Sequence, residues 1–321
     1  MSEVPRVSRK NIIQYQNPNP IEDRNLDIRS LVPKPDEIFA EVIKKEIPNA
    51  RNAEGYTPLT DDEIKDLITE SDDDVVRIEE AARNPNRWIE LEKIAKNSTR
   101  VIVCSAPGTY YQRFKKDPYE EFKWASGMDR QRSDISAIVG IHIAGIATGN
   151  DFSEFTNYNL LDGLTPKLDD KRDLVRQAIE ETDIRFVYLG TSAEAEAIRK
   201  VLRTQSSFIP NDKVDIIESS DPKYNTLGQV LDLKSYLKSH IQAPGTNVII
   251  PMGIQAIRAF PMMRKVDAIP EDLNVFLFPI PTPANGIREY ATMETKGRVY
   301  YTLTGAASRE MASHALIGTR S

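Results

Sequence analysis

The chain has 321 residues, and 42 Lys and Arg against 48 Asp and Glu give it a formal net charge of −6. This balance repels polyanions, and no stripe of Lys and Arg interleaved with aromatic residues offsets it, so we exclude nucleic acid as a partner. No apolar run approaches the roughly 20 residues that span a bilayer, so we expect no membrane partner either.

The start of the chain and its cysteine content bear on the compartment. Residues 1–20 lack the continuous apolar stretch of a secretory signal, and Cys104 has no second cysteine with which to form an intrachain disulfide. We therefore expect a cytoplasmic protein. A chain of this length buries roughly three quarters of its unfolded surface, which is enough for one large α/β domain and an accessory region.

The first hundred residues differ in composition from the rest. Residues 1–58 are rich in proline, asparagine and charge, and only 36–47 is amphipathic, so we predict an extended, partly disordered arm with one small helix. Residues 59–97 read as a helical accessory segment. Thr60 and Glu63 have the spacing of a capping box, which predicts a helix start at Thr60.

Two further features fall in the accessory segment. Asn84-Pro85 predicts a break between two helices, because the residue before a proline avoids the helical conformation. The acidic run at 71–74 is compatible with a metal site, but consecutive carboxylates ahead of a helix more often complement the helix dipole. We favour the second interpretation.

From residue 98 onward, short apolar runs alternate with amphipathic helical stretches. Each run ends in a small or polar turn that opens a helix, which is typical of right-handed βαβ crossovers. We therefore predict that residues 98–321 form an α/β domain of Rossmann-like, three-layer type with a mainly parallel sheet, and that the earlier residues are a helical and irregular extension. The predicted strands are 101–106, 185–190, 214–219, 247–252 and 274–281.

Ligands of such sheets bind at the carboxyl ends of the strands, so the turn residues form the candidate site. Thr191 and Ser192 follow Gly190, and Asn225 precedes Thr226 at a second helix start. Small polar residues there can hold a phosphate or carboxylate, and the alternative is that they are plain helix caps.

Two charged residues extend this candidate site. Arg258 lies early in the helix after 247–252, a helix that we predict to break at Pro261, and can bind an anion bidentately. Its alternative is a surface or interdomain salt bridge. Glu218 ends its strand and can accept hydrogen bonds from a ribose or an amine, or it pairs with Arg258 or a helix amide. One cation and one carboxylate suit a small polar or anionic molecule.

The order of these residues resembles the core of the DUF218 family of YdcF-, SanA- and ElyC-like α/β proteins, over about residues 100–305. That family has a glycine-ended strand before a Glu-Ala helix, an acidic residue before an Asn-Thr pair, and an Arg-Ala pair on a later helix. The matching positions are Gly190 with Glu194 or Glu196, Glu218, Asn225 with Thr226, Arg258 with Ala259, Arg130 or Arg132, and the turn from Ser105 to Gly108.

The resemblance implies a function. It implies a protein that binds a nucleotide or an S-adenosylmethionine-like ligand, acts as a transferase or hydrolase, and is linked to bacterial envelope metabolism. Gln255 stands where the family has a histidine, and Pro251 and Met252 replace a Thr-Ser turn. Because glutamine does not titrate near neutral pH, the proton-transfer role of that histidine is lost here.

Other chemistries find little support in the sequence. His142, His240 and His314 have no partners at metal-ligand spacing, so we expect no metal site, and no G-x-S-x-G elbow is present. We interpret His142 as a hydrogen-bonded packed residue and Cys104 as a small hydrophobe in a buried strand. The aromatic stretch at 110–124 is either a lid over the site or part of the core.

Two functions stay open. The first, which we favour, is a DUF218-like protein that binds a small molecule, with catalytic residues unassigned. The second is a non-catalytic structural or interaction protein that retains the fold and assembles as a homo-oligomer through its N-terminal arm, an alternative that Gln255 favours. The ligand contacts expected under the first function are Ser105, Gly108, Arg132, Gly190, Thr191, Ser192, Glu194, Glu218, Asn225, Thr226, Gln255 and Arg258.

Overall fold

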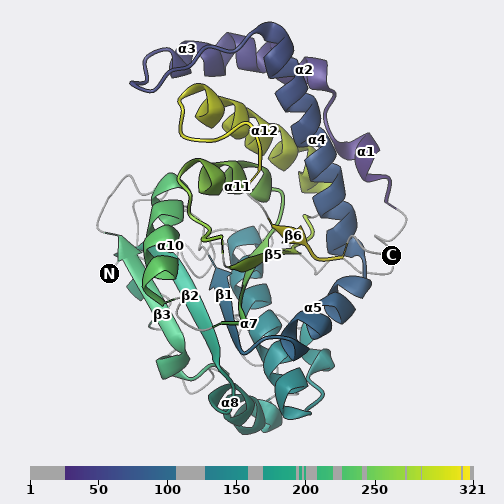
Figure 1. Cartoon of the computed structure of the whole chain (residues 1–321). Coiled ribbons are helices and arrows are strands. Elements are labelled where there is room, and N and C mark those ends of the chain that lie inside the picture. Colours follow the sequence, from purple (N-terminus) through teal and green to yellow (C-terminus); the bar gives the residue numbers. More distant parts are fainter. Residues whose placement is uncertain are drawn as a thin grey trace, which may run out of the picture.

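The computed structural model describes a parallel sheet covered by helices, with a further group of helices beside it (Figure 1). No described helix is both long and apolar enough to cross a bilayer. The described residues are 26–105, 127–157, 169–192, 195–196, 199, 208–219, 226–240, 244–271, 273–282, 284–311 and 314–318, with the backbone only for 105, 127–135, 156, 157, 169 and 240.

The six described strands pair in parallel throughout. Their spatial order is β3-β2-β1-β4-β5-β6, so the strand order reverses between β1 and β4. The mainly parallel sheet predicted from the sequence is confirmed, and only β6 was not predicted, because two residues carry no alternating pattern. The strands are β1 Arg100–Ser105, β2 Ile184–Thr191, β3 Val214–Ser219, β4 Thr246–Met252, β5 Asn274–Pro279 and β6 Ala315–Leu316.

Hydrophobic cores cover both faces of the sheet and make a three-layer α/β fold. The alternation along β1 shows this, since Ile102 and Cys104 face one core while Val101 and Val103 face the other. The first core includes α10 and α11, and the second includes α5, α7 and α8. Outside the N-terminal region, the helices are α7 Gly127–Thr148, α8 Arg172–Glu180, α10 Thr226–His240, α11 Ala256–Lys265 and α12 Ile287–Leu303, with short 3-10 turns at Ser153–Asn157, Asp169–Lys171, Asn211–Lys213 and Ala284–Gly286.

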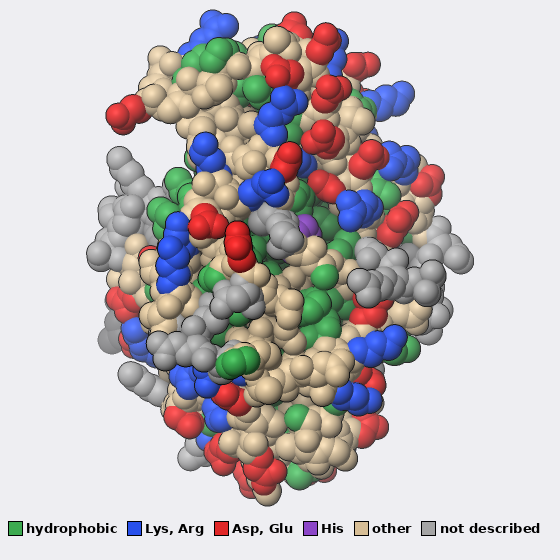
Figure 2. All heavy atoms as spheres, in the orientation of Figure 1, with side chains coloured by type: hydrophobic (Ala, Val, Ile, Leu, Met, Phe, Trp, Pro, Cys, Tyr) green, Lys and Arg blue, Asp and Glu red, His purple; other side chains and the backbone are tan. Residues whose placement is uncertain are grey.

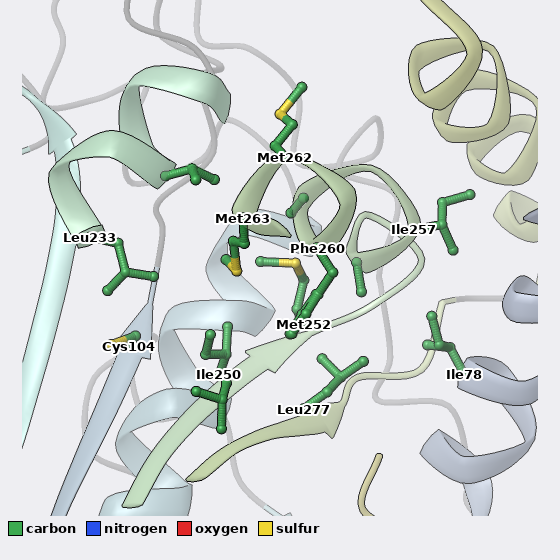
Figure 3. Close-up of a cluster of buried hydrophobic side chains, with 14 of the residues drawn as sticks. Ile78, Cys104, Leu233, Ile250, Met252, Ile257, Phe260, Met262, Met263 and Leu277 are labelled. Carbon is green, nitrogen blue, oxygen red and sulfur yellow. The ribbon is translucent and has the colours of Figure 1, made fainter. Parts of the chain in front are cut away.

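Helix α11 packs on β4 through a core rich in methionine. Met252 at the end of β4 and Met263 on α11 lie beside Phe260 (Figure 3). The predicted break at Pro261 is wrong, because α11 continues through this residue. A proline inside a helix loses one hydrogen bond, and burial of the residues around it offsets that loss. The carbonyl oxygen of Pro261 also accepts a hydrogen bond from the backbone N–H of Ser308, at 3.0 Å.

The start of helix α4 (Asp61–Arg83) is the predicted capping box. The Thr60 hydroxyl accepts from the backbone N–H of Glu63 at 3.2 Å, and the Glu63 carboxylate accepts from the backbone N–H of Thr60 at 2.8 Å. The local pattern of hydroxyl and carboxylate therefore suffices to place this helix start.

The end of α4 also agrees with the sequence, since the chain leaves the helix at Asn84 before α5 (Asn86–Lys96). The prediction that the acidic run at 71–74 precedes a helix and complements its dipole is wrong. The run lies in the middle of α4, so it neither precedes a helix nor complements a helix dipole. The helix continues through the run because buried residues recur at helical spacing on both sides of it, from Ile64 to Ala82.

Residues 26–58, within the segment predicted to be an extended arm, form helices packed on α4 and α12. Ile38 and Val42 are buried against residues of α4 and of α12, among them Leu67 and Val299. The small helix predicted at 36–47 is confirmed, but the extended arm around it is wrong for residues 26–58, because their apolar residues find partners far along the sequence. The elements are α1 Ile28–Leu31, α2 Pro35–Glu41, a π turn at Val42–Glu46 and α3 Ile47–Ala50.

Charge is mixed on the surface of the molecule. Figure 2 shows Lys, Arg, Asp and Glu side chains interspersed over the face that it presents, including the part formed by α4. Among the described residues on this face, no continuous basic stripe is visible.

Candidate functional site

The carboxyl ends of β3, β2, β1 and β4 lie side by side at one edge of the sheet, as the sequence predicts. In the parallel register, Gly190 pairs with Glu218 and Thr191 with Ser219. The reversal of strand order between β1 and β4 is the point at which ligands enter open α/β sheets, because the connections on its two sides leave in opposite directions. The predicted row of strand ends is therefore present in the structure.

At the end of β3, Glu218 is neutralised within the chain. Its Oε2 lies 2.9 Å from Nη1 of Arg199, and both side chains are about one-third exposed. Hydrogen bonds from Ser192 and then from Arg199 lower the pKa of Glu218, so it is ionised at neutral pH. The predicted alternative of pairing with Arg258 is wrong, because Arg199 takes that position.

At the start of α11, Arg258 turns toward α12. Its Nε lies 2.9 Å from Oε2 of Glu294, whose side chain is only 1% exposed, and its Nη2 donates to Oε1 at 3.4 Å. Gly297 on α12 leaves room for this approach, since a Cβ there would lie 3.0 Å from Cδ of Arg258. The salt-bridge alternative given for Arg258 is therefore the one observed.

Glu218 and Arg258 do not form one site. Two strands, β2 and β1, lie between β3 and β4, so three interstrand spacings of about 4.8 Å place the two strand ends about 14 Å apart. With each charge already paired, the predicted combination of one free cation and one free carboxylate is absent from the described part of the edge.

A different group of polar atoms lies at the end of β4. Gly253 and Gln255 follow β4, one of the two strands at the reversal of strand order, and Thr282 follows β5. These three residues are here named the Gly253 corner. Gln255 is 6% exposed and Thr282 0%, and among the described residues Gln255 Oε1 and Thr282 Oγ1 have no hydrogen-bond partner. A Cβ placed on Gly253 would lie 3.3 Å from the first oxygen and 3.9 Å from the second. Leaving a buried oxygen without a hydrogen bond costs free energy, so these two oxygens make the corner a candidate ligand contact.

The backbone of Thr282 is fixed by a buried ion pair on α4. The Glu79 carboxylate oxygens accept from its N–H at 3.2 and 3.1 Å, and Nη2 of Arg83 donates to its carbonyl oxygen at 2.6 Å. Glu79 and Arg83 also bond to each other, and their side chains are 0% and 8% exposed. Burial raises the pKa of Glu79, and the charge of Arg83 and the Thr282 hydrogen bonds oppose this effect.

A second arginine, Arg87, lies beside this pair and is partly buried. Nη1 of Arg87 donates to the Pro279 carbonyl oxygen at 3.3 Å, and its guanidinium lies over the rings of Phe278 and Trp88 at 5.4 and 5.7 Å. Burial lowers the pKa of Arg87 to about 10, so it is charged at neutral pH. The cations near the corner thus outnumber the anion Glu79.

His142 and Cys104 are packed residues. The His142 ring meets Trp88 edge to face at 5.2 Å and burial lowers its pKa. Its Nε2 has no partner among the described residues, so the predicted hydrogen bond is not made by this nitrogen. Cys104 lies in the sheet core near Leu233 and Ile250 (Figure 3), and burial raises its thiol pKa to about 12. A thiol with such a pKa is no nucleophile at neutral pH, as expected.

The remaining predicted contacts fall into two groups. Gly190 and Thr191 are buried at the end of β2, the hydroxyl of Ser192 donates to the Ser219 carbonyl oxygen at 3.5 Å, and Thr226 opens α10 as predicted. The others lie outside the described residues or have an undescribed side chain: Gly108, Glu194, Asn225 and the stretch 110–124 in the first case, Ser105 in β1 and Arg132 in α7 in the second.

Sequence reasoning missed Glu79, Arg83 and Thr282. A signal existed for the first, since Glu79 lies next to Ile78 on the apolar side of a long helical pattern and has an arginine four residues later. Thr282 carried no signal, because only folding brings it to α4. The described residues hold no group of three or more His, Cys, Asp or Glu side chains suited to a metal ion.

Known proteins offer no guide to this site. Models of known protein families, curated proteins and solved structures were compared with the chain, and none matched. The function is therefore inferred from the geometry and from the sequence resemblance alone.

Proposed function

We propose that the protein is a DUF218-like, Rossmann-like α/β protein that binds a nucleotide or an S-adenosylmethionine-like molecule across the strand ends. The observation that carries this proposal is the strand order β3-β2-β1-β4-β5-β6 with every pair parallel. Doubly wound sheets with this order bind dinucleotides at the reversal point, between the first strand and the fourth. The polar turns that the resemblance singles out all follow strands of this edge.

The ligand under this proposal lies across the ends of β3, β2, β1 and β4. A nucleotide is long enough for the span of about 14 Å between the outer strand ends. The helix starts after β2 and β3 supply backbone N–H groups for phosphate or carboxylate oxygens, and Asn225 would add a side-chain contact by the resemblance. With Gln255 in place of the family histidine, the proposed role is binding, and any transferase or hydrolase chemistry takes its proton acceptor from elsewhere.

A thermal-shift screen of the full chain tests the proposal. The panel contains AMP, ATP, S-adenosylmethionine, nicotinamide mononucleotide and sugar phosphates, and a true ligand raises Tm by several degrees at a hundredfold excess over Kd. Asn225→Ala is the test variant, expected to lose the shift. Ser235→Ala, on the exposed side of α10, is the matched control and keeps it. The absence of a shift with every compound would overturn the proposal.

One observation favours the alternative of a non-catalytic interaction protein. Glu218 and Arg258, the two charged contacts expected for a ligand, are both paired within the chain. Under this alternative the N-terminal region drives homo-oligomer formation. Light scattering of the full chain and of a chain lacking residues 1–25 then shows a concentration-dependent oligomer that the deletion abolishes, together with no response in the ligand screen.

A further inference from the structure

We propose that Gln255 and Thr282 form a subsite for a neutral, planar NH2 group of the ligand. This inference rests on the proposed function and adds the ligand chemistry that the Gly253 corner selects. A planar NH2 group occurs either as the exocyclic amine of a nucleobase or as a carboxamide, and both present two hydrogens in one plane. The two unpartnered oxygens of the corner, an amide oxygen and a hydroxyl oxygen, are matched acceptors.

Because Gly253 has no side chain, no Cβ presses against these two buried oxygens. A Cβ there would lie 3.0 Å from the Ile280 carbonyl oxygen as well as within 4 Å of Gln255 Oε1 and Thr282 Oγ1. Three acceptor oxygens therefore surround one side of this glycine, and any larger residue would press on them. Since neither oxygen receives a hydrogen bond from the described residues, the group that complements them is a donor.

The hydroxyl of Thr282 is held in place for this role. The Glu79–Arg83 pair binds both the N–H and the carbonyl oxygen of Thr282. Oγ1 is therefore the polar atom of Thr282 left for another molecule. Because both members of the pair are buried, rotation of this peptide would break buried hydrogen bonds to charged groups. This is the arrangement of a preorganised contact, with a rigid element behind the binding atom.

Local charge decides between a neutral donor and an ammonium group. The corner lies near one buried anion, Glu79, and two cations, the buried guanidinium of Arg83 and the partly buried one of Arg87. The remaining positive charge disfavours a primary ammonium and is compatible with an uncharged amine or amide. A buried water could satisfy the same oxygens, and the experiment below includes that outcome.

Matched ligand pairs test the subsite by titration calorimetry on the full chain. AMP against IMP reports on a nucleobase amine, and nicotinamide mononucleotide against nicotinic acid mononucleotide reports on a carboxamide. We expect the parent to prefer the NH2 compound by about tenfold in at least one pair, as one neutral hydrogen bond to a rigid site implies. Thr282→Val and Gln255→Leu should each bring that preference close to one.

Thr295→Val is the control for indirect effects. Thr295 Oγ1 is also buried without a partner among the described residues, but it lies on α12, on a different element from the corner. This variant should keep the full preference of the parent. Its Tm, measured beside that of Thr282→Val, shows whether both proteins are folded.

Four results overturn the inference. Equal affinities within both pairs would remove the NH2 subsite while the proposed function stands. A parent preference that survives in both Thr282→Val and Gln255→Leu would place the recognition elsewhere, as would a crystal structure of the complex with a water still bridging the two oxygens. Failure of the parent to bind any nucleotide would remove the proposed function as well, and so separates the two failures.

Discussion

Glu79 and Thr282 lie 203 residues apart in the sequence and are joined by hydrogen bonds from the Thr282 N–H to both oxygens of the Glu79 carboxylate. Arg83 binds the carbonyl oxygen of the same residue. Helix α4 therefore fixes the peptide that follows β5, next to the end of β4. The accessory segment that precedes the α/β domain in sequence is part of the candidate site in space.

Replacing Glu79 by glutamine tests this link. Glu79→Gln keeps the shape of the side chain but leaves Arg83 buried without a counter-ion, so we expect the free energy of unfolding to fall by about 3 kcal/mol. Urea denaturation measures it. Glu37→Gln, which breaks the exposed pair with Arg288, is the control and should cost much less. Equal losses of unfolding free energy in the two variants would show that the buried pair stabilises the fold no more than the exposed one.

Arg258→Ala should destabilise the protein whether or not a ligand is present. It leaves Glu294 buried and unpaired, at a cost of about 3 kcal/mol in the free energy of unfolding. Arg264→Ala is the matched control on the same helix, because Arg264 pairs with the exposed Glu310. If Arg258→Ala abolishes ligand binding yet unfolds at the parental urea concentration, then Arg258 is a ligand contact, as the sequence predicts.

Removing the hydroxyl of Thr302 should lower the free energy of unfolding, whereas removing that of Thr282 should not. Thr302 Oγ1 donates to the Arg298 carbonyl oxygen at 2.9 Å, so Thr302→Val should lower the free energy of unfolding by about 1 kcal/mol. Thr282→Val removes a buried oxygen without a partner among the described residues, and should leave the stability of the ligand-free protein unchanged or raise it by up to about 1 kcal/mol. Calorimetric melting of both variants checks the signs, and a clear loss in Thr282→Val would mean that its hydroxyl is already satisfied.

Asp72 on α4 should make stability depend on pH. Both of its carboxylate oxygens are buried without a partner among the described residues, and burial raises its pKa to about 7, with a smaller contribution from Asp73. Because this folded-state value lies above the unfolded one, the folded protein keeps the proton longer. The stabilisation is complete near pH 4, is lost as the pH rises toward 7, and changes little beyond.

Asp72→Asn removes this titration. The variant should be more stable than the parent by about 2–4 kcal/mol at pH 8, with a difference that shrinks toward pH 4. Urea denaturation at several pH values measures it. Asp73→Asn serves as the control, since Asp73 is exposed and pairs with Arg29 at 2.7 Å. A parent and an Asp72→Asn variant with parallel pH profiles would contradict the buried titration.

The sheet could be predicted from the sequence because each of its long strands has a recognisable local pattern. Val101 to Cys104, for example, form a continuous apolar run before a polar turn, which is how a strand buried on both faces reads. The capping box at Thr60 was equally local. The break predicted at Pro261 failed because packing around that residue outweighs the lost hydrogen bond.

The site was less predictable, because its contacts join distant parts of the chain. Arg258 reads as an anion-binding residue until Glu294, 36 residues later, is brought against it. Arg199 lies 19 residues before Glu218, and only the pairing of β2 with β3 brings the two together. Thr282 gains its role only from Glu79 on α4. Residue type and helix position predicted which side chains could bind a ligand, but not which would already be paired.

The crystal structure of the protein with the nucleotide that most raises its Tm tests the central claim most directly. We predict that the ligand lies at the carboxyl ends of β1 and β4, with an NH2 group within hydrogen-bond distance of Gln255 and Thr282. A ligand bound anywhere away from this edge of the sheet would contradict the account.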